Sequence, residues 1–78
     1  MDYPIKTVDQ MGVILRSIRK DQGLTQIEAG EKVGLLPKTV SALENNSGTS
    51  SIESLMKYLS ALKQDIVITP RKEEKDLW

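Results

Sequence analysis

The side chains that most often carry out chemistry in proteins are sparse in this sequence. It contains no His and no Cys, which removes the commonest general base and metal ligand and excludes disulfides and thiolate metal sites. No loop has the Asp-rich spacing of a calcium site. Without a nucleophile–base set an enzyme is not expected, and the sequence assigns no metal, cofactor or catalytic residue.

Binding is the chemistry that remains, and the lysines indicate where it would occur. The 11 basic residues balance the 11 acidic residues, so the field of the whole molecule does not drive strong nucleic-acid binding. Residues 32–43, however, contain Lys32 and Lys38 and no acidic side chain. A surface that meets the phosphates of DNA would have to lie in this segment.

A first helix is predicted over residues 8–21. Thr7 and Gln10 match a capping box at its start. The apolar residues that follow recur at the spacing of one helical face, namely Val8, Met11, Leu15 and Ile18. Val13 and Ile14 lie off this face, so they contact either solvent or a partner.

Two short helices are predicted next, over residues 26–32 and 37–44. A second capping box opens the first of them at Thr25, and Pro37 suits the first position of the other, where its missing N–H is no loss. Gly30, inside the shorter helix, costs about 1 kcal/mol relative to Ala. Such a glycine indicates the close approach of a neighbouring helix.

A fourth helix and one strand complete the prediction. Ser50 and Glu53 form a third capping box, and the apolar face of the helix it opens extends to Leu62. Residues 65–69 are rich in β-branched side chains and predict a strand that Pro70 ends. A lone strand cannot satisfy its own backbone N–H and C=O groups, so a homodimer with one strand from each protomer is expected.

The predicted fold is therefore all-α, a small bundle of four to five helices plus one C-terminal strand that pairs between protomers. An N-terminal arm covers residues 1–6 and a helical domain covers residues 7–64. A dimerisation strand over residues 65–70 and a flexible tail over residues 71–78 follow. The expected core comprises Met11, Leu15, Ile18, Val33, Val40, Leu43, Leu55 and Leu59.

Two short helices joined at Gly34 have helix-turn-helix geometry, in which the second helix projects and fits the major groove of DNA. Over about residues 8–62 the sequence resembles the Cro and phage-repressor type (XRE) helix-turn-helix family. The ordered set of matching pieces carries this resemblance. The central pieces are Gly23-Leu24-Thr25-Gln26, Glu28, Lys32-Val33-Gly34, Thr39-Val40-Ser41 and Leu43-Glu44-Asn45. Upstream of them are Met11-Gly12, Leu15-Arg16 and Ile18-Arg19, and downstream is the stretch from Ser51-Ile52 to Ala61-Leu62.

The resemblance implies contacts with the DNA backbone. Thr25 would cap the second helix and, together with Gln26, meet a phosphate beside the N–H groups of the helix start. Thr39 and Asn45 would also contact the backbone. Such contacts position a protein on DNA without reading its sequence.

Base readout would fall to the third helix, with Lys38 and Ser41 on its groove-facing side. At Leu36 and Pro37 the family usually carries polar residues, so these positions offer apolar contact at most, for example with a thymine methyl group. Ala42 is likewise short and apolar. Direct readout would then depend mainly on Lys38.

The resemblance also implies an ion pair between Arg19 and Glu44, which would bridge the first helix to the end of the third. The alternative is that both are separate exposed charges.

A narrower resemblance, to HipB-type antitoxins, is carried by the single strand and the charged tail that ends in Trp78. It implies pairing of Ile66, Val67 and Ile68 between protomers. It also implies a HipA-type kinase toxin as partner, into which Leu77 and Trp78 would dock. The alternatives are a frayed terminus and a strand folded back on its own helices.

The expected function is sequence-specific binding of double-stranded operator DNA by a homodimer. It would act as a transcriptional repressor and as the antitoxin of a HipBA-type pair that regulates its own operon. Two alternatives stay open: a stand-alone phage-type or stress regulator, and a protein-interaction module that has lost DNA binding. No apolar run is long enough to span a bilayer and no signal-peptide pattern is found, so a cytoplasmic protein without a membrane partner is expected.

Overall fold

The computed structural model describes residues 3–71 of the chain. That range contains four α-helices and one 3-10 helix, which are α1 (Val8–Asp21), α2 (Gln26–Glu31), α3 (Pro37–Asn45), η1 (Ser47–Thr49) and α4 (Ile52–Ala61). The prediction of a small all-α bundle is confirmed. Among these residues no helix is long and apolar enough to cross a membrane.

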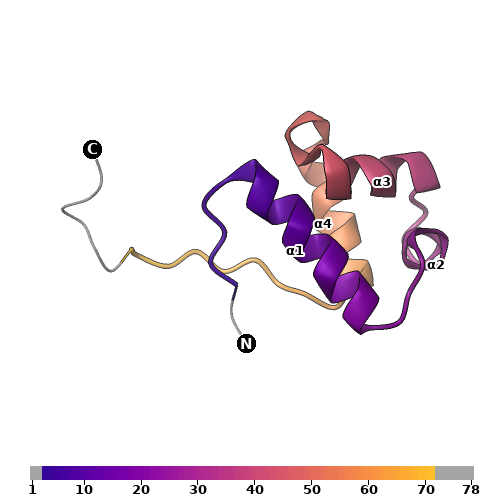
Figure 1. Cartoon of the computed structure of the whole chain (residues 1–78), viewed down its shortest axis with the longest axis horizontal. Coiled ribbons are helices and arrows are strands. Elements are labelled where there is room, and N and C mark those ends of the chain that lie inside the picture. The colour runs from indigo at the N-terminus through magenta and orange to yellow at the C-terminus, as the bar shows by residue number, and fades with distance from the viewer. Residues whose placement is uncertain (1–2, 72–78) are drawn as a thin grey trace.

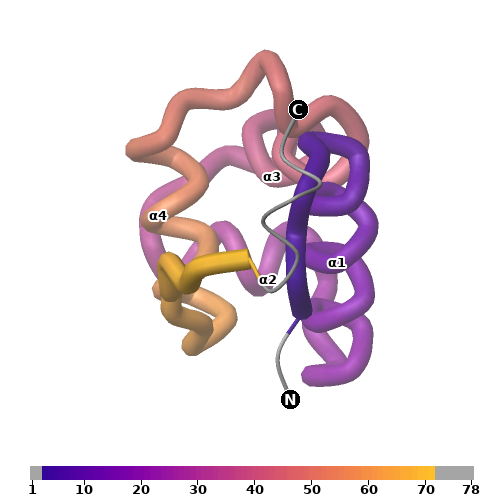
Figure 2. The backbone as a smooth tube through the Cα atoms, turned by 90° about the vertical axis from the view of Figure 1, so that its left-hand side faces the viewer, coloured from indigo at the N-terminus to yellow at the C-terminus, as the bar shows by residue number. Residues whose placement is uncertain are grey.

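α3 lies at the centre of the bundle, since it packs against α1, α2 and α4. Figure 1 shows α1 running beside α3, with α2 at one end of the molecule. Residues 3–7 and residues 65–71 both extend toward the side away from α2. In the view turned by 90°, α1 and α4 lie on opposite sides (Figure 2).

Two of the three predicted capping boxes are present. The Thr7 hydroxyl accepts a hydrogen bond from the Gln10 N–H at 3.2 Å, and α1 begins after it. The Thr25 hydroxyl accepts one from the Glu28 N–H at 3.0 Å, and the Glu28 carboxylate accepts from the Thr25 N–H at 2.8 Å. Local hydrogen bonding therefore sets where α1 and α2 begin.

The third capping box is wrong by one residue. Ser51, not Ser50, caps α4, and its hydroxyl accepts from the Ser54 N–H at 3.0 Å. The reason is η1, which uses Ser50 to end its own turn, the Ser50 N–H donating to the Ser47 carbonyl at 3.0 Å. The Ser50 hydroxyl is left buried without a hydrogen-bond partner.

Most of the predicted core is correct. Of the eight expected residues, five are buried and three, Met11, Val33 and Leu55, are half-buried against them. Tyr58 and Leu62 are fully buried as well, although they were not in the expected core. Val8 belongs to the first turn of α1 and is exposed. The buried residues are Leu15, Ile18, Ala29, Val40, Leu43, Tyr58, Leu59, Ala61 and Leu62.

The two residues that lie off the inner face of α1 behave differently. Val13 is exposed, whereas Ile14 is half-buried and packs against the core.

Two glycines allow the helices to approach closely. A Cβ atom on Gly30 would lie 2.6 Å from the Leu35 carbonyl oxygen and 3.0 Å from Val40 Cγ2, so the expected close approach at Gly30 is confirmed. A Cβ atom on Gly12 would collide with the backbone carbonyl of Glu44. Gly12 therefore sets how closely α1 approaches the C-terminal end of α3.

The predicted strand does not form within the single chain. Residues 3–71 contain no strand, and residues 65–70 carry no hydrogen-bonded neighbour of the kind that a strand requires. Ile66 and Val67 are exposed and Ile68 is 94% exposed, so the segment is not folded back on its own helices either. The tail that includes Leu77 and Trp78 lies outside the described residues.

Candidate nucleic-acid interface

One side of α3 is buried and the other is open. Val40 and Leu43 point into the core. At positions spaced by three and four residues on the other side lie Lys38, Ser41, Ala42 and Asn45, which are exposed or half-buried. This spacing places them on one helical face, the face that the sequence predicts to meet DNA. α3 ends at Asn45, one residue later than expected, so Asn45 belongs to the helix.

A tight turn positions the start of this helix. Gly34 adopts a φ of 74°, a left-handed conformation that suits glycine, and the Leu35 N–H donates to the Gly30 carbonyl at 2.9 Å. α2 consequently ends at Glu31, one residue earlier than expected, with Lys32 as its C-cap. Leu36 is left 69% exposed at the N-cap of α3, beside an exposed Pro37.

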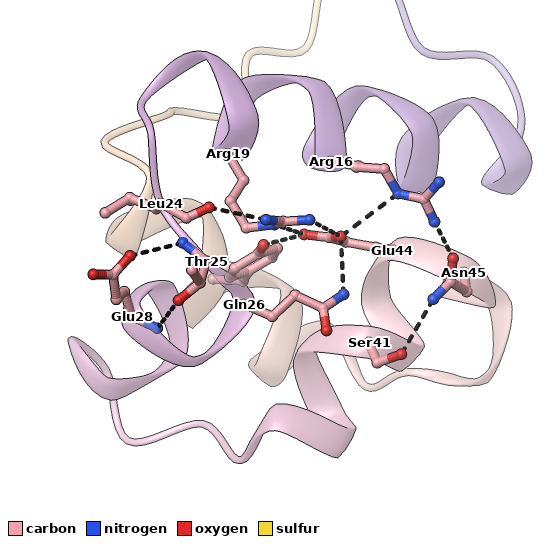
Figure 3. A network of polar contacts seen from close by, with 10 residues as sticks. Arg16, Arg19, Leu24, Thr25, Gln26, Glu28, Ser41, Glu44 and Asn45 are labelled. Carbon is pink, nitrogen blue, oxygen red and sulfur yellow. Dashed lines mark hydrogen bonds and ion pairs between the residues drawn. The ribbon is translucent and has the colours of Figure 1, made fainter.

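Behind the open face, α3 is tied to α1 by a buried ion pair. Arg19 Nε donates to Glu44 Oε2 at 2.7 Å and Arg19 Nη2 donates to Glu44 Oε1 at 3.0 Å (Figure 3). Arg19 is 8% exposed and Glu44 is 4% exposed. The planar guanidinium of arginine favours such a bidentate pair with a carboxylate. The alternative of two separate exposed charges does not describe this structure.

The Glu44 carboxylate also receives other donors. Gln26 Nε2 of α2 donates to Oε1 at 3.2 Å, and the Tyr58 hydroxyl of α4 donates to Oε2. Arg16 Nε of α1 lies 3.7 Å from Oε1. We call Arg16, Arg19, Gln26, Glu44 and Tyr58 the Glu44 cluster. It links all four α-helices and holds α3 in place by its inner side.

These contacts shift the titration of the cluster. Burial by itself raises the pKa of Glu44, but hydrogen bonds from Arg19, Tyr58 and Gln26 outweigh it and hold the pKa below its ordinary value. The hydrogen bond to Glu44 raises the pKa of Arg19, and burial followed by the bond to Glu44 raises the pKa of Tyr58. At neutral pH Glu44 is therefore ionised, the buried Arg19 is charged and the Tyr58 phenol keeps its proton.

Glu44 should make the stability of the fold depend on pH. The pKa of Glu44 is lowered from the ordinary value of 4.5 that it has in the unfolded chain. Its charge therefore stabilises the fold fully at pH values above 4.5, and this stabilisation is lost as the pH falls through the folded-state pKa. Urea unfolding at a series of pH values should show wild-type stability approaching that of a Glu44→Gln variant in acid. A constant difference between the two proteins from neutral to acid pH would contradict this.

The residues predicted to contact phosphates are accessible to different degrees. Thr25 is exposed and Thr39 is half-buried. One amide hydrogen of Gln26 is engaged by Glu44, and the second remains available to another acceptor, since the amide group carries two. Gln26 thus joins the predicted interface to the cluster behind it.

Arg16 is a residue that the sequence reasoning did not place at this surface. Its Nη2 donates to the Asn45 side-chain oxygen, and Asn45 Nδ2 donates to the Ser41 hydroxyl at 3.1 Å (Figure 3). Arg16 precedes Arg19 by three residues, so both lie on the same face of α1. That spacing was the available signal, because the face that carries Arg19 toward α3 also carries Arg16.

The fold and this arrangement define a class of protein. Residues 15–67, more than half of the chain, match the family described as Helix-turn-helix. The chain belongs to this family, of the XRE type. Its members are DNA-binding domains rather than enzymes.

Relatives of this chain include antitoxins. Antitoxin HipB of Escherichia coli O6:H1 is 29% identical over 63 residues, which cover 81% of this chain and 67% of the relative. Putative antitoxin HigA2 of Mycobacterium tuberculosis is 36% identical over 58 residues, which cover 73% of this chain and 57% of the relative. The domain is therefore a distant homologue of HipB and related to HigA antitoxins.

Solved structures agree with this relationship. A chain of the HipA-HipB-O2-O3 complex superposes with a TM-score of 0.87 at 25% identity, over 91% of this chain and 100% of that chain. A chain of the HipB-O4 20mer complex superposes with a TM-score of 0.86 at 25% identity, with the same coverage of 91% and 100%.

Proposed function

We propose that this protein binds double-stranded operator DNA through the open face of α3 and represses transcription as a homodimer. The observation that carries the proposal is that α3 has one open face and one face that is anchored to the rest of the bundle. Its outer face presents Lys38, Ser41 and Asn45, while Glu44 on the inner side is bonded to three other helices. A helix held rigidly from behind keeps its outward side chains in register with the groove.

Within this interface, Lys38 is the main candidate for base readout, because a lysine can donate to a guanine edge. Leu36, Pro37 and Ala42 supply apolar contacts. Thr25, Gln26 and Thr39 supply contacts to phosphates, which set the position on the duplex.

Dimerisation would use the exposed strand-like segment. Ile66, Val67 and Ile68 leave apolar side chains and unpaired backbone groups open to solvent, and pairing with the same segment of a second chain would satisfy both. A dimer of helix-turn-helix domains would contact two half-sites about one helical turn apart, roughly 34–36 Å between centres.

The relatives extend the proposal to an antitoxin that acts with a toxin. Because the structure superposes on a chain of the HipA-HipB-O2-O3 complex, a HipA-type kinase is the proposed partner, with Leu77 and Trp78 as its docking residues. Deleting both should weaken such a complex and leave DNA affinity unchanged.

The exposed Leu36 favours a second candidate, an interaction module that has lost DNA binding. Footprinting of the promoter region upstream of the gene at low salt, where phosphate contacts are strongest, separates the two. Protection of two half-sites supports operator binding, and no protection supports the module.

Lys38→Ala should weaken binding to the protected duplex by about 1–3 kcal/mol if Lys38 reads a guanine edge. Lys57→Ala is the matched control, because Lys57 lies on α4 and pairs with Glu53 at 3.7 Å. Fluorescence anisotropy with specific and random duplexes measures both variants. Equal affinities for wild type and Lys38→Ala would mean that α3 does not enter the groove as proposed.

Val67→Pro should abolish the dimer, since proline removes a backbone donor from the two-chain sheet. Val67→Thr keeps the N–H group and the branched side chain and should stay dimeric. Sedimentation equilibrium reports the mass of each variant. A fully dimeric Val67→Pro protein would place the dimer interface elsewhere.

A further inference from the structure

At the open face of α3, two of its side chains, Asn45 and Ser41, form with Arg16 of α1 a series of hydrogen bonds that run in one direction. Arg16 donates to the Asn45 side-chain oxygen, and Asn45 Nδ2 donates to Ser41 Oγ at 3.1 Å (Figure 3). Arg16 is held in turn by Glu44, 3.7 Å from its Nε, while its side chain stays 44% exposed. The series therefore begins at the Glu44 cluster and ends at Ser41.

The direction of these bonds follows from the chemistry of arginine. A guanidinium has donors and no acceptor, so Asn45 must turn its oxygen toward Arg16. Its NH₂ group then faces Ser41, and the Ser41 oxygen has to accept. The opposite orientation of the amide would set donor against donor at Arg16.

The proton of the Ser41 hydroxyl is left over. The Asn45 NH₂ group cannot accept this proton, because it is itself a donor. Within residues 3–71 the Ser41 hydroxyl donates to no protein acceptor. Ser41 shares the open face with Lys38, at a spacing of three residues. An uncommitted donor on that face points to an acceptor on the bound partner.

We infer that Arg16 and Asn45 are positioning residues that make Ser41 a hydrogen-bond donor to the DNA. Serine by itself pairs with either kind of group. In this protein the base favoured opposite Ser41 is one that offers an acceptor to the hydroxyl proton, which is purine N7, guanine O6 or thymine O4. An amino group of cytosine or adenine could use only the remaining lone pair of the Ser41 oxygen and would leave the hydroxyl proton without an acceptor, so these groups are disfavoured opposite Ser41. This inference rests on the proposed binding of DNA through α3.

The test uses a duplex selected by the wild-type protein from a randomised pool, in which single acceptors are then deleted. 7-Deazapurines remove N7, 2-aminopurine removes guanine O6, and 5-methyl-2-pyrimidinone removes thymine O4. At one position of each half-site, the deletion should weaken wild-type binding about three- to tenfold, the effect of one hydrogen bond. Ser41→Ala should bind parent and analogue duplexes equally at that position. Ser60→Ala, an exposed serine of α4, should behave as wild type.

Asn45→Asp tests the positioning step. Aspartate offers only acceptors, so it would still bind Arg16 but would draw the Ser41 proton toward itself. The ratio of affinities for parent and analogue duplexes should then fall to one. Because this ratio is taken within one variant, the added negative charge of aspartate cancels from it.

The other results overturn the inference. Amino groups are deleted with 2-pyrimidinone in place of cytosine or purine in place of adenine. If such a deletion weakens binding by the wild-type protein but not by Ser41→Ala, Ser41 acts as an acceptor and the inference is overturned. A wild-type response to acceptor deletion that survives in Ser41→Ala or in Asn45→Asp also overturns it. If the protein recovers no duplex from the pool and binds none at low salt, the proposed function fails, and the inference with it.

Discussion

Replacing Glu44 by Gln should lower the free energy of unfolding by about 3–5 kcal/mol, the usual cost of removing one member of a buried ion pair. Arg19 would keep its charge at 8% exposure without its carboxylate. The Tyr58 hydroxyl and the Gln26 amide would have to share an acceptor that no longer carries a charge. Small domains often have only about 5 kcal/mol of stability in total, so the variant should be close to unfolding.

Urea unfolding followed by circular dichroism measures this loss. The matched control is Glu53→Gln, because Glu53 also pairs with a basic side chain, Lys57, but both groups are exposed. An exposed pair of this kind contributes about 0–1 kcal/mol. Equal losses in the two variants would show that the Glu44 cluster does not hold the helices together.

Gly12→Ala should destabilise the protein by about 1–3 kcal/mol, the usual cost of overpacking. Helix propensity alone predicts the opposite sign, a gain of about 1 kcal/mol for alanine in a helix. The steric collision outweighs the gain in helix propensity. The added methyl group would meet the backbone carbonyl of Glu44, and a backbone carbonyl cannot rotate away as a side chain can. α1 would have to move away from α3, and the Arg19–Glu44 geometry would change with it.

Gly48→Ala is the control for this prediction. A Cβ atom on Gly48 would meet only Val8 Cγ2, at an ordinary 3.8 Å, so its stability should stay close to wild type. Thermal unfolding of both variants under the same conditions makes the comparison. A Gly12→Ala protein more stable than wild type would mean that α1 and α3 do not approach as closely as described.

The sequence by itself determined the features that depend on neighbours three or four residues apart. The caps at Thr7 and Thr25 are hydrogen bonds across three residues, and the apolar faces of the helices repeat within a single turn. Gly34 marked the turn because glycine adopts a positive φ more readily than other residues. Such local rules are sufficient to predict the order of the helices and the open face of α3.

The Arg19–Glu44 contact was anticipated only through the family resemblance, since 25 residues separate the two. Composition and spacing alone left them as separate charges. Ser50 failed as a cap for a related reason. The Ser50 N–H is hydrogen-bonded within the short η1 turn, and no periodicity in the sequence predicts this turn.

Only the tertiary structure decided which polar side chains meet. Arg16 and Asn45 are 29 residues apart, and Gln26 and Tyr58 reach Glu44 across 18 and 14 residues. Their partners depend on how the helices cross, and this in turn depends on Gly12 and Gly30, where a side chain would hold the backbones apart. The conformation of residues 65–70 likewise depends on contacts that lie outside the segment itself. Their β-branched side chains favour a strand, but a strand needs backbone partners, and residues 3–71 of one chain do not supply them.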